Sequence, residues 1–333
     1  MLESYGKERT WRSKGHVRIS CTAAAPASTA NLGPGFDVFG LGLDALEDIV
    51  RIYKMPGTSR QVSIKVSGEN HTSIPADADH NSAGLVIKKI STDFNILSDL
   101  QVTILKRVPA GFGMGSSAAS AAAAAIALDG LFDLKIEKEK LIEYAAEGEI
   151  ASAGTKHYDN VSGAILGGFV IVRTRPHLEF IRIAPPEDLV LVVAVPAVTQ
   201  SARKTEVARS VLPDHVPLRN VVHNVSAAST VVAGFALKDI EMIARGIDDV
   251  IVEPARMFMI PGYDAVKRNA LRSGALAVTI SGAGPSMISF LNTDKNALTV
   301  AQRMAAGFGE AKIESRTYVC KPSGGAKIIS TME

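Results

Sequence analysis

The sequence predicts an α+β protein with two lobes. Segments that alternate with a period of two, typical of strands, are interspersed with segments of helical spacing. The chain has 333 residues, which is enough for two domains. A proline-rich stretch, APPED at residues 184–188, divides it. We therefore expect an amino-terminal domain over residues 16–185 and a carboxy-terminal domain over residues 186–333.

The pattern of each segment predicts the order of elements. Two predicted strands, 16–27 and 48–55, flank a glycine-rich turn region. Further strands are predicted at 60–68, 99–109 and 163–174, and strand character at 180–196 continues across the domain boundary. The predicted helices of the first domain are 81–94, 116–128 and 137–151. The second domain is expected to contain helices at 205–213, 219–237 and 240–251, and a strand, glycine turn and strand over 276–291. A further helix and strand end the chain.

Composition excludes several classes of protein. The net charge is +2 and aromatic residues make up 5% of the chain, so no basic groove with stacking residues for nucleic acid is predicted. Cys21 and Cys320 match neither a disulfide framework nor a zinc spacing. The polar first residues do not resemble a signal peptide, and no continuous apolar run reaches about 18 residues. We expect a cytoplasmic protein without a membrane partner.

The stretch PAGFGMGSSAAS, residues 109–120, places flexible backbone directly before an alanine-rich helix. The first N–H groups of a helix lack internal partners and favour an anion, and glycine lets a ligand approach the backbone. The spacing fits neither a Walker loop nor a dinucleotide fingerprint. A glycine-rich turn without a ligand is the alternative. The spacing predicts a phosphate cradle, with the Ser116 and Ser117 hydroxyls offered to phosphate oxygens or to a magnesium ion. The residues expected to form it are Pro109, Ala110, Gly111, Phe112, Gly113, Met114, Gly115, Ser116, Ser117 and Ala118.

Three motifs occur in the order found in the superfamily of galactokinase, homoserine kinase, mevalonate kinase and phosphomevalonate kinase, the GHMP kinases. PAGFGMGSSAAS resembles the ATP loop of these enzymes, with Met114 where leucine is usual. APASTANLGPGFDVFGLGLD at 25–44 and SGAGPSMISF at 281–290 resemble the other two motifs. The resemblance implies a first lobe related to a domain of ribosomal protein S5, a ferredoxin-like second lobe, and ATP bound between them.

The first of these motifs is most similar to that of the homoserine kinases. Asn31 can both donate and accept hydrogen bonds, and the Asp37 carboxylate suits an ammonium group. These properties fit an amino-acid substrate. A turn or helix cap formed by Asp37 is the alternative.

GEIASAGTKHYDNVSGAILGGF, residues 148–169, resembles a further family segment. The resemblance implies that Glu149 and Ser117 hold Mg²⁺ beside ATP. Glu147 is a weaker candidate because residues two apart face different sides of a helix. A packing or hydrogen-bonding role is expected for His157.

Asn160 occupies a position where mevalonate kinases and galactokinases carry the aspartate that accepts the substrate proton. An amide does not accept a proton at neutral pH, so the interpretation is direct transfer, with Asn160 orienting the hydroxyl and positioning and charge providing the acceleration. The neighbouring Asp159 is the alternative base.

Two further segments, TEVARSVLP at 205–213 and VEPARMFMIPGY at 252–263, resemble arginine-containing family segments. The resemblance implies that Arg209 and Arg256 bind the substrate carboxylate, with Thr205 beside them; a guanidinium suits a planar carboxylate better than an ammonium does. Surface salt bridges are the alternative for both arginines. Arg203 and Lys204 lie close by without an assigned role.

The function implied is ATP-dependent phosphorylation of L-homoserine to O-phospho-L-homoserine for threonine synthesis. The groups expected to support the transfer are Asn160, Ser117, Glu149 and Arg209. The alternatives are a kinase of the same superfamily acting on mevalonate, shikimate or a sugar, and a non-catalytic ligand sensor. Family members are commonly dimers, so a homodimer is expected.

Overall fold

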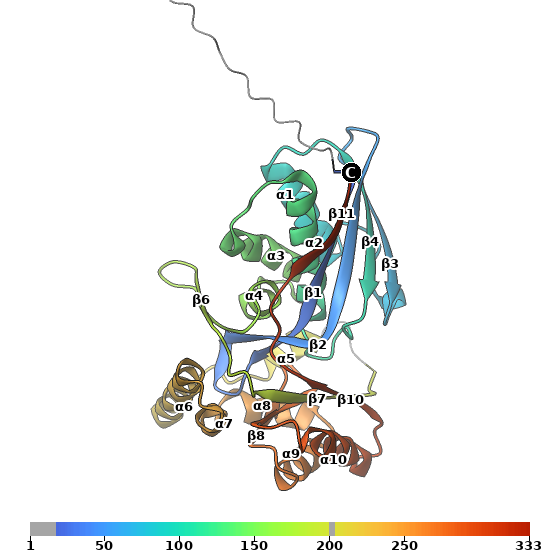
Figure 1. The fold of residues 1–333 in the computed structure, drawn as a ribbon. Coiled ribbons are helices and arrows are strands. Elements are labelled where there is room, and N and C mark those ends of the chain that lie inside the picture. Colours follow the sequence, from blue (N-terminus) through green and yellow to red (C-terminus); the bar gives the residue numbers. More distant parts are fainter. Residues whose placement is uncertain (1–17, 200–203) are drawn as a thin grey trace, which may run out of the picture.

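Two sheets organise residues 18–199 and 204–333, the part of the chain that the computed structural model describes (Figure 1). Within these residues, a seven-stranded sheet has the order β11-β1-β2-β4-β3, with β5 and β6 attached to β2, and a four-stranded sheet has the order β10-β7-β9-β8. The strands of the larger sheet are β1 Ser20–Asn31, β2 Gly35–Met55, β3 Val62–Gly68, β4 Asp99–Lys106, β5 Phe169–Arg173, β6 Glu179–Ile183 and β11 Lys327–Met332. The strands of the smaller sheet are β7 Val190–Pro196, β8 Ala277–Ile280, β9 Met287–Leu291 and β10 Ser315–Cys320.

Helices α1 to α4 pack on one face of the larger sheet, and the later helices belong to the smaller lobe (Figure 1). In the first lobe the helices are α1 Ser82–Asp93, α2 Ser116–Phe132, α3 Lys138–Ala153 and α4 Tyr158–Leu166, with a 3₁₀ turn η1 His71–Ser73. The helices that follow are α5 Lys204–Ser210, α6 Leu218–Leu237, α7 Ile240–Gly246, α8 Val252–Arg256, α9 Tyr263–Arg272 and α10 Ala297–Glu310, with a 3₁₀ turn η2 Met257–Met259. The predicted α+β class with two lobes is confirmed.

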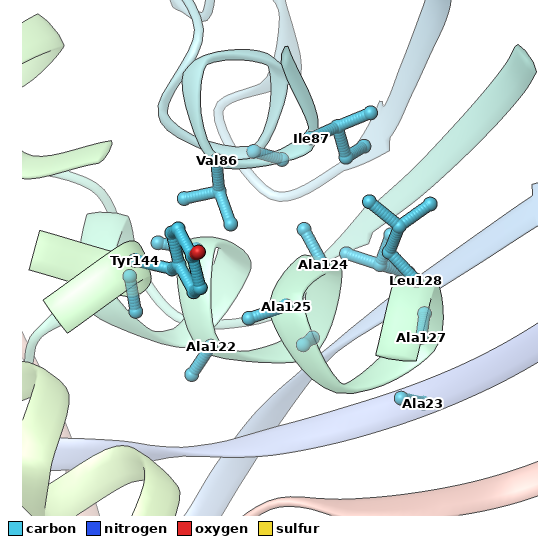
Figure 2. Close-up of a cluster of buried hydrophobic side chains, with 14 of the residues drawn as sticks. Ala23, Val86, Ile87, Ala122, Ala124, Ala125, Ala127, Leu128 and Tyr144 are labelled. Carbon is cyan, nitrogen blue, oxygen red and sulfur yellow. The ribbon is translucent and has the colours of Figure 1, made fainter. Parts of the chain in front are cut away.

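The alanine run of α2 forms the centre of the first lobe. Figure 2 shows its alanines and Leu128 surrounded by Val86 and Ile87 of α1, Tyr144 of α3 and Ala23 of β1. Because alanine has only a methyl side chain, α2 fits closely between the sheet and two helices, and almost every residue from Ser116 to Leu131 is buried.

The glycine-rich segment expected to be a turn region is mostly strand. β1 and β2 pair nearly to their ends, and only residues 32–34 turn. A Cβ atom at Gly40 of β2 would lie 2.1 Å from the Asp159 carbonyl oxygen of α4. Glycine in this part of β2 therefore serves close packing of α4 on the strand.

The predicted strand 163–174 is wrong over its first residues, where α4 continues to Leu166. An apolar run of this length fits a buried helix as well as a strand, and here helical spacing buries Val161 and Ile165 together. Gly167 and Gly168, with φ of 63° and 68°, then turn the chain into β5.

The two faces of β7 belong to two different hydrophobic cores. Leu191, Val193 and Val195 face the interface with the first lobe, where the ring of Phe235 from α6 stacks on Phe169 of β5 at 4.0 Å. Val190 and Val192 face the opposite side, under α9 and α10. A strand whose two faces are both buried is apolar throughout, as the sequence of β7 is.

The change of sheet falls between β6, which ends at Ile183, and β7, which begins at Val190. The last strand then returns across this boundary, because β11 pairs antiparallel with β1 in the larger sheet (Figure 1). Residues 327–332 therefore belong structurally to the first lobe.

Candidate active site

A cavity of about 550 Å³ lies between the lobes and collects most of the predicted site residues. Its walls come from the β1–β2 turn, the segment before α1, the glycine loop, α3, α4, α5, α8 and the turn between β8 and β9. The lining includes Asn31, Phe36, Asp37, Lys106, Ala110, Gly111, Gly113, Gly115, Ser116, Ser117, Glu149, His157, Asp159, Asn160, Arg209, Arg256 and Gly282.

The glycine loop lies at the start of α2 and carries three positive φ angles. Gly111, Gly113 and Gly115 have φ of 84°, 76° and 63°, a region that glycine adopts without steric cost. The first helical hydrogen bond runs from Ala119 N–H to the Gly115 carbonyl, so the preceding N–H groups point along the helix axis at the cavity end. The loop has the geometry of an anion cradle.

The second lobe closes directly on this loop. Ser281 Oγ donates to the Gly113 carbonyl at 2.7 Å, and a Cβ atom at Gly113 would lie 2.1 Å from the Ser281 carbonyl oxygen. Ser286 N–H also reaches the Phe112 carbonyl, at 3.4 Å. Gly113 is therefore required by contact between the lobes as well as by its φ.

Some loop residues named from the sequence do not line the cavity. These are Pro109, Phe112, Met114 and Ala118. Met114 and Ala118 have fully buried side chains that belong to the cores, so only their backbone is available to a ligand. The Ser116 hydroxyl, expected to face phosphate, donates instead to the Val108 carbonyl at 2.7 Å and tightens the loop.

A buried ion pair that the sequence did not reveal lies behind the loop. Lys106 at the end of β4 contacts Asp48 of β2 and donates to the Ser116 carbonyl and Ser120 Oγ, each at 2.8 Å. Asp48 Oδ1 accepts the N–H groups of Arg107 and Val108 at 2.9 and 3.0 Å. This network fixes the chain entering the loop to the first turn of α2.

Glu149 and Ser117 lie together in the cavity near the start of α2, beside the glycine loop. The Glu149 carboxyl is buried, which raises its pKa to about 7, although a hydrogen bond from the Ser117 side chain opposes the shift. A cation beside this carboxylate would restore its ordinary acidity. Among the described residues no cluster of three or more His, Cys, Asp or Glu is placed to hold a metal, so an ion here would need oxygen ligands from outside the protein as well.

Asp159 and Asn160 begin α4 in the middle of the cavity wall. Burial raises the pKa of Asp159 to about 6, and the negative charge of Asp37 adds to the shift. Asp159 Oδ1 accepts the Asn160 backbone N–H at 2.7 Å, and Ser28 Oγ donates to Asn160 Oδ1 at 3.0 Å. The Asn160 side chain is thus oriented by its neighbours.

Charged side chains from three elements meet at the other end. Arg209 of α5 forms an ion pair with Asp37 of β2, with its Nη2 atom 2.9 Å from both carboxylate oxygens. The Arg209 and Arg256 guanidinium carbons lie 5.4 and 5.1 Å from the centre of the Phe36 ring. The expected partners were a substrate ammonium group for Asp37 and the substrate carboxylate for Arg209, and the structure brings these two side chains into direct contact with each other.

His157 also belongs to this end. Arg209 Nη2 lies 3.0 Å from His157 Nδ1, and because a guanidinium only donates, this nitrogen accepts. Its proton then sits on Nε2, 3.2 Å from Thr155 Oγ1. Burial and the charge of Arg209 lower the pKa of His157, so the ring is neutral at pH 7. The sequence predicted packing or hydrogen bonding here and did not place His157 in the cavity wall.

Arg256 and Asn31 are held by the backbone of neighbouring segments. Arg256 Nε donates to the Ala208 carbonyl at 2.9 Å, which joins α8 to α5, and burial lowers its pKa. Asn31 Nδ2 donates to the Gly282 carbonyl at 2.8 Å, and its Oδ1 accepts the Asp37 N–H at 3.1 Å. Asn31 therefore positions the Asp37 turn and links it to the second lobe.

Thr205 and Lys204 are described only as backbone of α5, and Arg203 lies outside the described residues. The Thr205 backbone is one helical turn before Arg209.

Two family models cover much of both lobes. "GHMP kinases N terminal domain" matches residues 81–168, and "GHMP kinases C terminal" matches residues 231–310. A homoserine kinase of Methanocella arvoryzae is 39% identical over 314 residues, which cover 94% of this chain and 99% of that protein. One from Methanococcus maripaludis is 40% identical over 266 residues, covering 80% and 85%.

The chain belongs to the homoserine kinase family of the GHMP kinases. The crystal structure of homoserine kinase from Cytophaga hutchinsonii superposes with a TM-score of 0.88 at 33% identity, covering 98% of this chain and all of that one. A mevalonate kinase from L. major has the same fold, with a TM-score of 0.71 at 16% identity. The predicted two-domain kinase fold and enzyme class are confirmed.

Proposed function

We propose that this protein transfers the γ-phosphoryl group of ATP to the side-chain hydroxyl of L-homoserine, forming O-phospho-L-homoserine for threonine biosynthesis. One observation supports this above the rest. The cavity has an anion cradle and an oxygen pair suited to Mg²⁺ at one end, and Asp37, Arg209 and Arg256 at the other. A substrate with one ammonium, one carboxylate and a hydroxyl tail matches that arrangement.

The ATP phosphates would bind the loop of residues 109–118 through its N–H groups and the positive end of α2. The cavity wall beyond the loop is formed by Ile74 and Pro75 and by His80 to Ser82. We assign the nucleoside to this wall, because it contains both apolar and hydrogen-bonding groups.

Ser117 and Glu149 would hold Mg²⁺ together with phosphate oxygens. One hydroxyl and one carboxylate fit an ion that keeps several waters and binds mainly through its nucleotide. When bound, the ion neutralises charge that develops on the phosphate oxygens. The Ser117–Glu149 hydrogen bond keeps both ligands on the same side of the cavity.

The Asp37–Arg209 ion pair would exchange partners when the amino acid binds. The substrate ammonium would take Asp37, and the substrate carboxylate would take Arg209 and Arg256. A zwitterion supplies both counter-charges at once, so no charge in the cavity is left unpaired. We assign Asn31 and Thr205 to substrate binding beside these groups; in the case of Asn31 this acts through the Asp37 turn that it holds.

In the transfer itself, the homoserine oxygen attacks the γ-phosphorus, the bond from phosphorus to the β,γ-bridging oxygen breaks, and the hydroxyl proton passes to a phosphoryl oxygen. Asn160 would orient the hydroxyl, and Arg209 would stabilise charge on the transferred group. Asp159, the alternative base, has both its nearest donors from Asn160, at 2.7 and 3.5 Å, on Oδ1. Asparagine keeps an oxygen that can accept from Asn160, and the proposed direct transfer needs no protein base, so Asp159→Asn should preserve most of the activity.

Purified protein with Mg-ATP and a panel of homoserine, mevalonate, shikimate and galactose tests the substrate. We expect ADP release with homoserine at a catalytic efficiency at least 100-fold above that with the others. Preference for mevalonate or a sugar would establish another member of the superfamily. ATP binding without turnover of any of the four would favour a ligand sensor.

We also propose that the enzyme is a cytoplasmic homodimer, with residues 16–185 as the ATP-binding domain and 186–333 as the carboxy-terminal kinase domain, apart from β11, which pairs with β1 of the first lobe. Its partners would be small molecules, and neither nucleic acid nor a membrane. α6 contains no continuous apolar run of about 18 residues, but it has the length and mean hydropathy of a helix that could cross a membrane. However, α6 is packed on its lobe through Val231 and Phe235.

A further inference from the structure

A buried carboxylate that takes no part in the proposed transfer lies in the second lobe. Glu253 is on α8, three residues before Arg256, and is only 7% exposed. α8, α9 and β8 lie together in the smaller lobe (Figure 1). Glu253 does not line the cavity, but it shares its helix with an arginine that does.

The Glu253 carboxylate accepts hydrogen bonds from two other elements. On α9, the Tyr263 hydroxyl donates to Oε1, and the Lys267 ammonium donates to the same oxygen at 2.6 Å. On β8, Thr279 Oγ1 donates to Oε2. Burial and the negative charge of Glu253 raise the pKa of Tyr263, so its hydroxyl keeps the proton that it donates. Because both oxygens have donors, α9 and β8 together fix the position of the carboxylate.

α8 depends on such contacts for its own position. It spans five residues, and a helix this short is not stable through its own hydrogen bonds. At its start, Asp249 Oδ2 accepts the Glu253 N–H at 2.7 Å, which holds the backbone. The Glu253 side chain then fixes the rotation of the helix about its axis. Residues three apart are neighbours on a helix, so a displacement at Glu253 is passed on to Arg256.

Arg256 itself is held without a carboxylate. Its Nε atom donates to the Ala208 carbonyl at 2.9 Å, and its Nη1 atom donates to the Gly282 carbonyl at 3.5 Å. Arg209 pairs with Asp37, whereas Arg256 forms no ion pair with another residue that the structure describes. The buried Arg256 guanidinium therefore keeps donors for a substrate carboxylate, and their direction depends on how α8 is placed.

The same network joins α8 to the turn that closes on the first lobe. Thr279, which donates to Glu253, is in β8, and β8 leads directly into the turn that contains Gly282. The Gly282 carbonyl accepts from Arg256 and, at 2.8 Å, from Asn31 Nδ2. Glu253 therefore fixes Arg256 relative to the segment that carries the proposed ammonium-binding carboxylate.

We propose that Glu253 is a positioning residue for the amino-acid substrate, which holds α8 so that the Arg256 guanidinium faces the substrate carboxylate. The inference rests on the proposed function, because it adds a residue to the same site. Replacing a buried ion pair with apolar side chains often costs no stability, whereas charge-assisted hydrogen bonds from several sides hold a side chain in one place. The Glu253–Lys267 pair therefore contributes geometry more than free energy of folding.

Steady-state kinetics of Glu253→Gln provide the first test. Glutamine has nearly the same shape, but it lacks the charge and offers one acceptor oxygen where three donors converge. Lys267 is 38% exposed and can turn to water, so the variant is expected to fold. The KM for homoserine should rise about 10-fold, with kcat and the KM for ATP within about threefold of the wild type, because only binding of the substrate carboxylate is weakened.

Glu310→Gln is the matched control. Glu310 of α10 also accepts from two side chains of α9, Arg268 and Asn269, each at 2.8 Å, and it does not line the cavity between the lobes. This variant loses a comparable contact on the same helix. It should leave kcat and both KM values unchanged.

A double-mutant cycle with Arg256→Lys separates positioning from a general loss of stability. Lysine keeps the charge and loses the planar fork, so Arg256→Lys alone should raise the KM for homoserine. Adding Glu253→Gln should raise it by less than about twofold further, because Glu253 acts on the substrate only through the guanidinium. A residue that only stabilises the lobe would contribute its full factor in both backgrounds. Tyr263→Phe, which removes one donor and keeps the ring, provides the same cycle with a milder change and an expected rise of about threefold.

Several outcomes would overturn the role of Glu253. These are an unchanged KM for homoserine in both Glu253→Gln and Tyr263→Phe, equal rises in the KM values for homoserine and ATP, full additivity with Arg256→Lys, and an equal effect of Glu310→Gln. Absence of homoserine turnover by the wild type would instead overturn the proposed function, so the two failures are distinguishable.

Discussion

The two ends of the cavity, proposed to bind phosphate (the phosphate end) and homoserine (the substrate end), present different chemical groups to a ligand. At the phosphate end, backbone groups of a glycine loop face the cavity, and the loop is held by Ser281 of the other lobe and by the buried Lys106–Asp48 pair. At the substrate end, charged side chains face each other, and those of Asp37 and Arg209 are 42% and 37% exposed.

The contacts that stabilise the fold are therefore concentrated at the phosphate end, and the side chains that would bind the amino acid are at the substrate end. Backbone dipoles held by buried contacts are ready for phosphate before it arrives. The charged side chains at the other end satisfy one another, and in the proposed mechanism they exchange partners when the substrate binds. Changes at the phosphate end should therefore affect stability or turnover, and changes at the substrate end should affect one substrate.

The largest effect is expected behind the phosphate loop. Asp48→Ala leaves the buried Lys106 ammonium without its counter-charge and should lower the free energy of unfolding by about 3–5 kcal/mol. Urea denaturation measures this. Glu47→Ala is the matched control, since it removes only a partly exposed contact with Lys327, and should cost about 1 kcal/mol or less. Equal losses in both variants would contradict a preformed phosphate end.

At the proposed Mg²⁺ ligand, Glu149→Gln should reduce kcat/KM by about 10²–10³-fold, because the variant loses the carboxylate that supports charge neutralisation. The reduction should be accompanied by a higher Mg²⁺ requirement in steady-state assays. Glu147→Gln, whose side chain pairs with Lys156 outside the cavity, should behave like the wild type. Unchanged Mg²⁺ dependence in Glu149→Gln would remove Glu149 from the metal site.

At the substrate end, Asp37→Ala should raise the KM for homoserine roughly 10–100-fold, the range of about 1.5–3 kcal/mol for a charge-assisted hydrogen bond. The KM for ATP should change less than threefold (~0.6 kcal/mol). Initial rates with each substrate varied in turn provide the measurement. Equal increases in both values would show that the two ends are not separate.

The smallest effect on activity is expected at Asp159, which lines the same cavity. Its replacement should instead change how the stability of the protein depends on pH. Its pKa in the folded protein is about 6, above the ordinary value of 3.8, so the folded state holds its proton more tightly than the unfolded state. The penalty is absent below about pH 4, grows as the pH rises to 6, and is complete above it.

Asp159→Asn should therefore gain about 3 kcal/mol of stability relative to the wild type at pH 7 and little at pH 4. Denaturant titrations at the two pH values measure the gain, with the exposed Asp133→Asn as control. A gain that does not depend on pH would contradict burial of an ionised Asp159.

Residue types at the motifs predicted much of the site. Asp37, Asn160, Arg209 and Glu149 come from four separate elements and line one cavity, as the resemblance implied. The Asp48–Lys106 pair was missed because β2 and β4 carry other charged or polar side chains, such as Glu47, Arg51 and Gln101. The pattern of either strand does not distinguish a buried pair from solvated charges, since the partner is 58 residues away in the chain.

The amino-acid sequence by itself determined the two-lobe α+β class, the glycine loop before α2 and the order of most elements, because period, glycine and proline act over a few neighbouring residues. Only the tertiary structure decided that 163–166 is helical, that β11 returns to the first sheet, and that Val222 and Val225 of α6 are exposed while Val231 is buried. Those outcomes depend on which surfaces meet, and the free energy of such contacts comes from residues far apart along the chain.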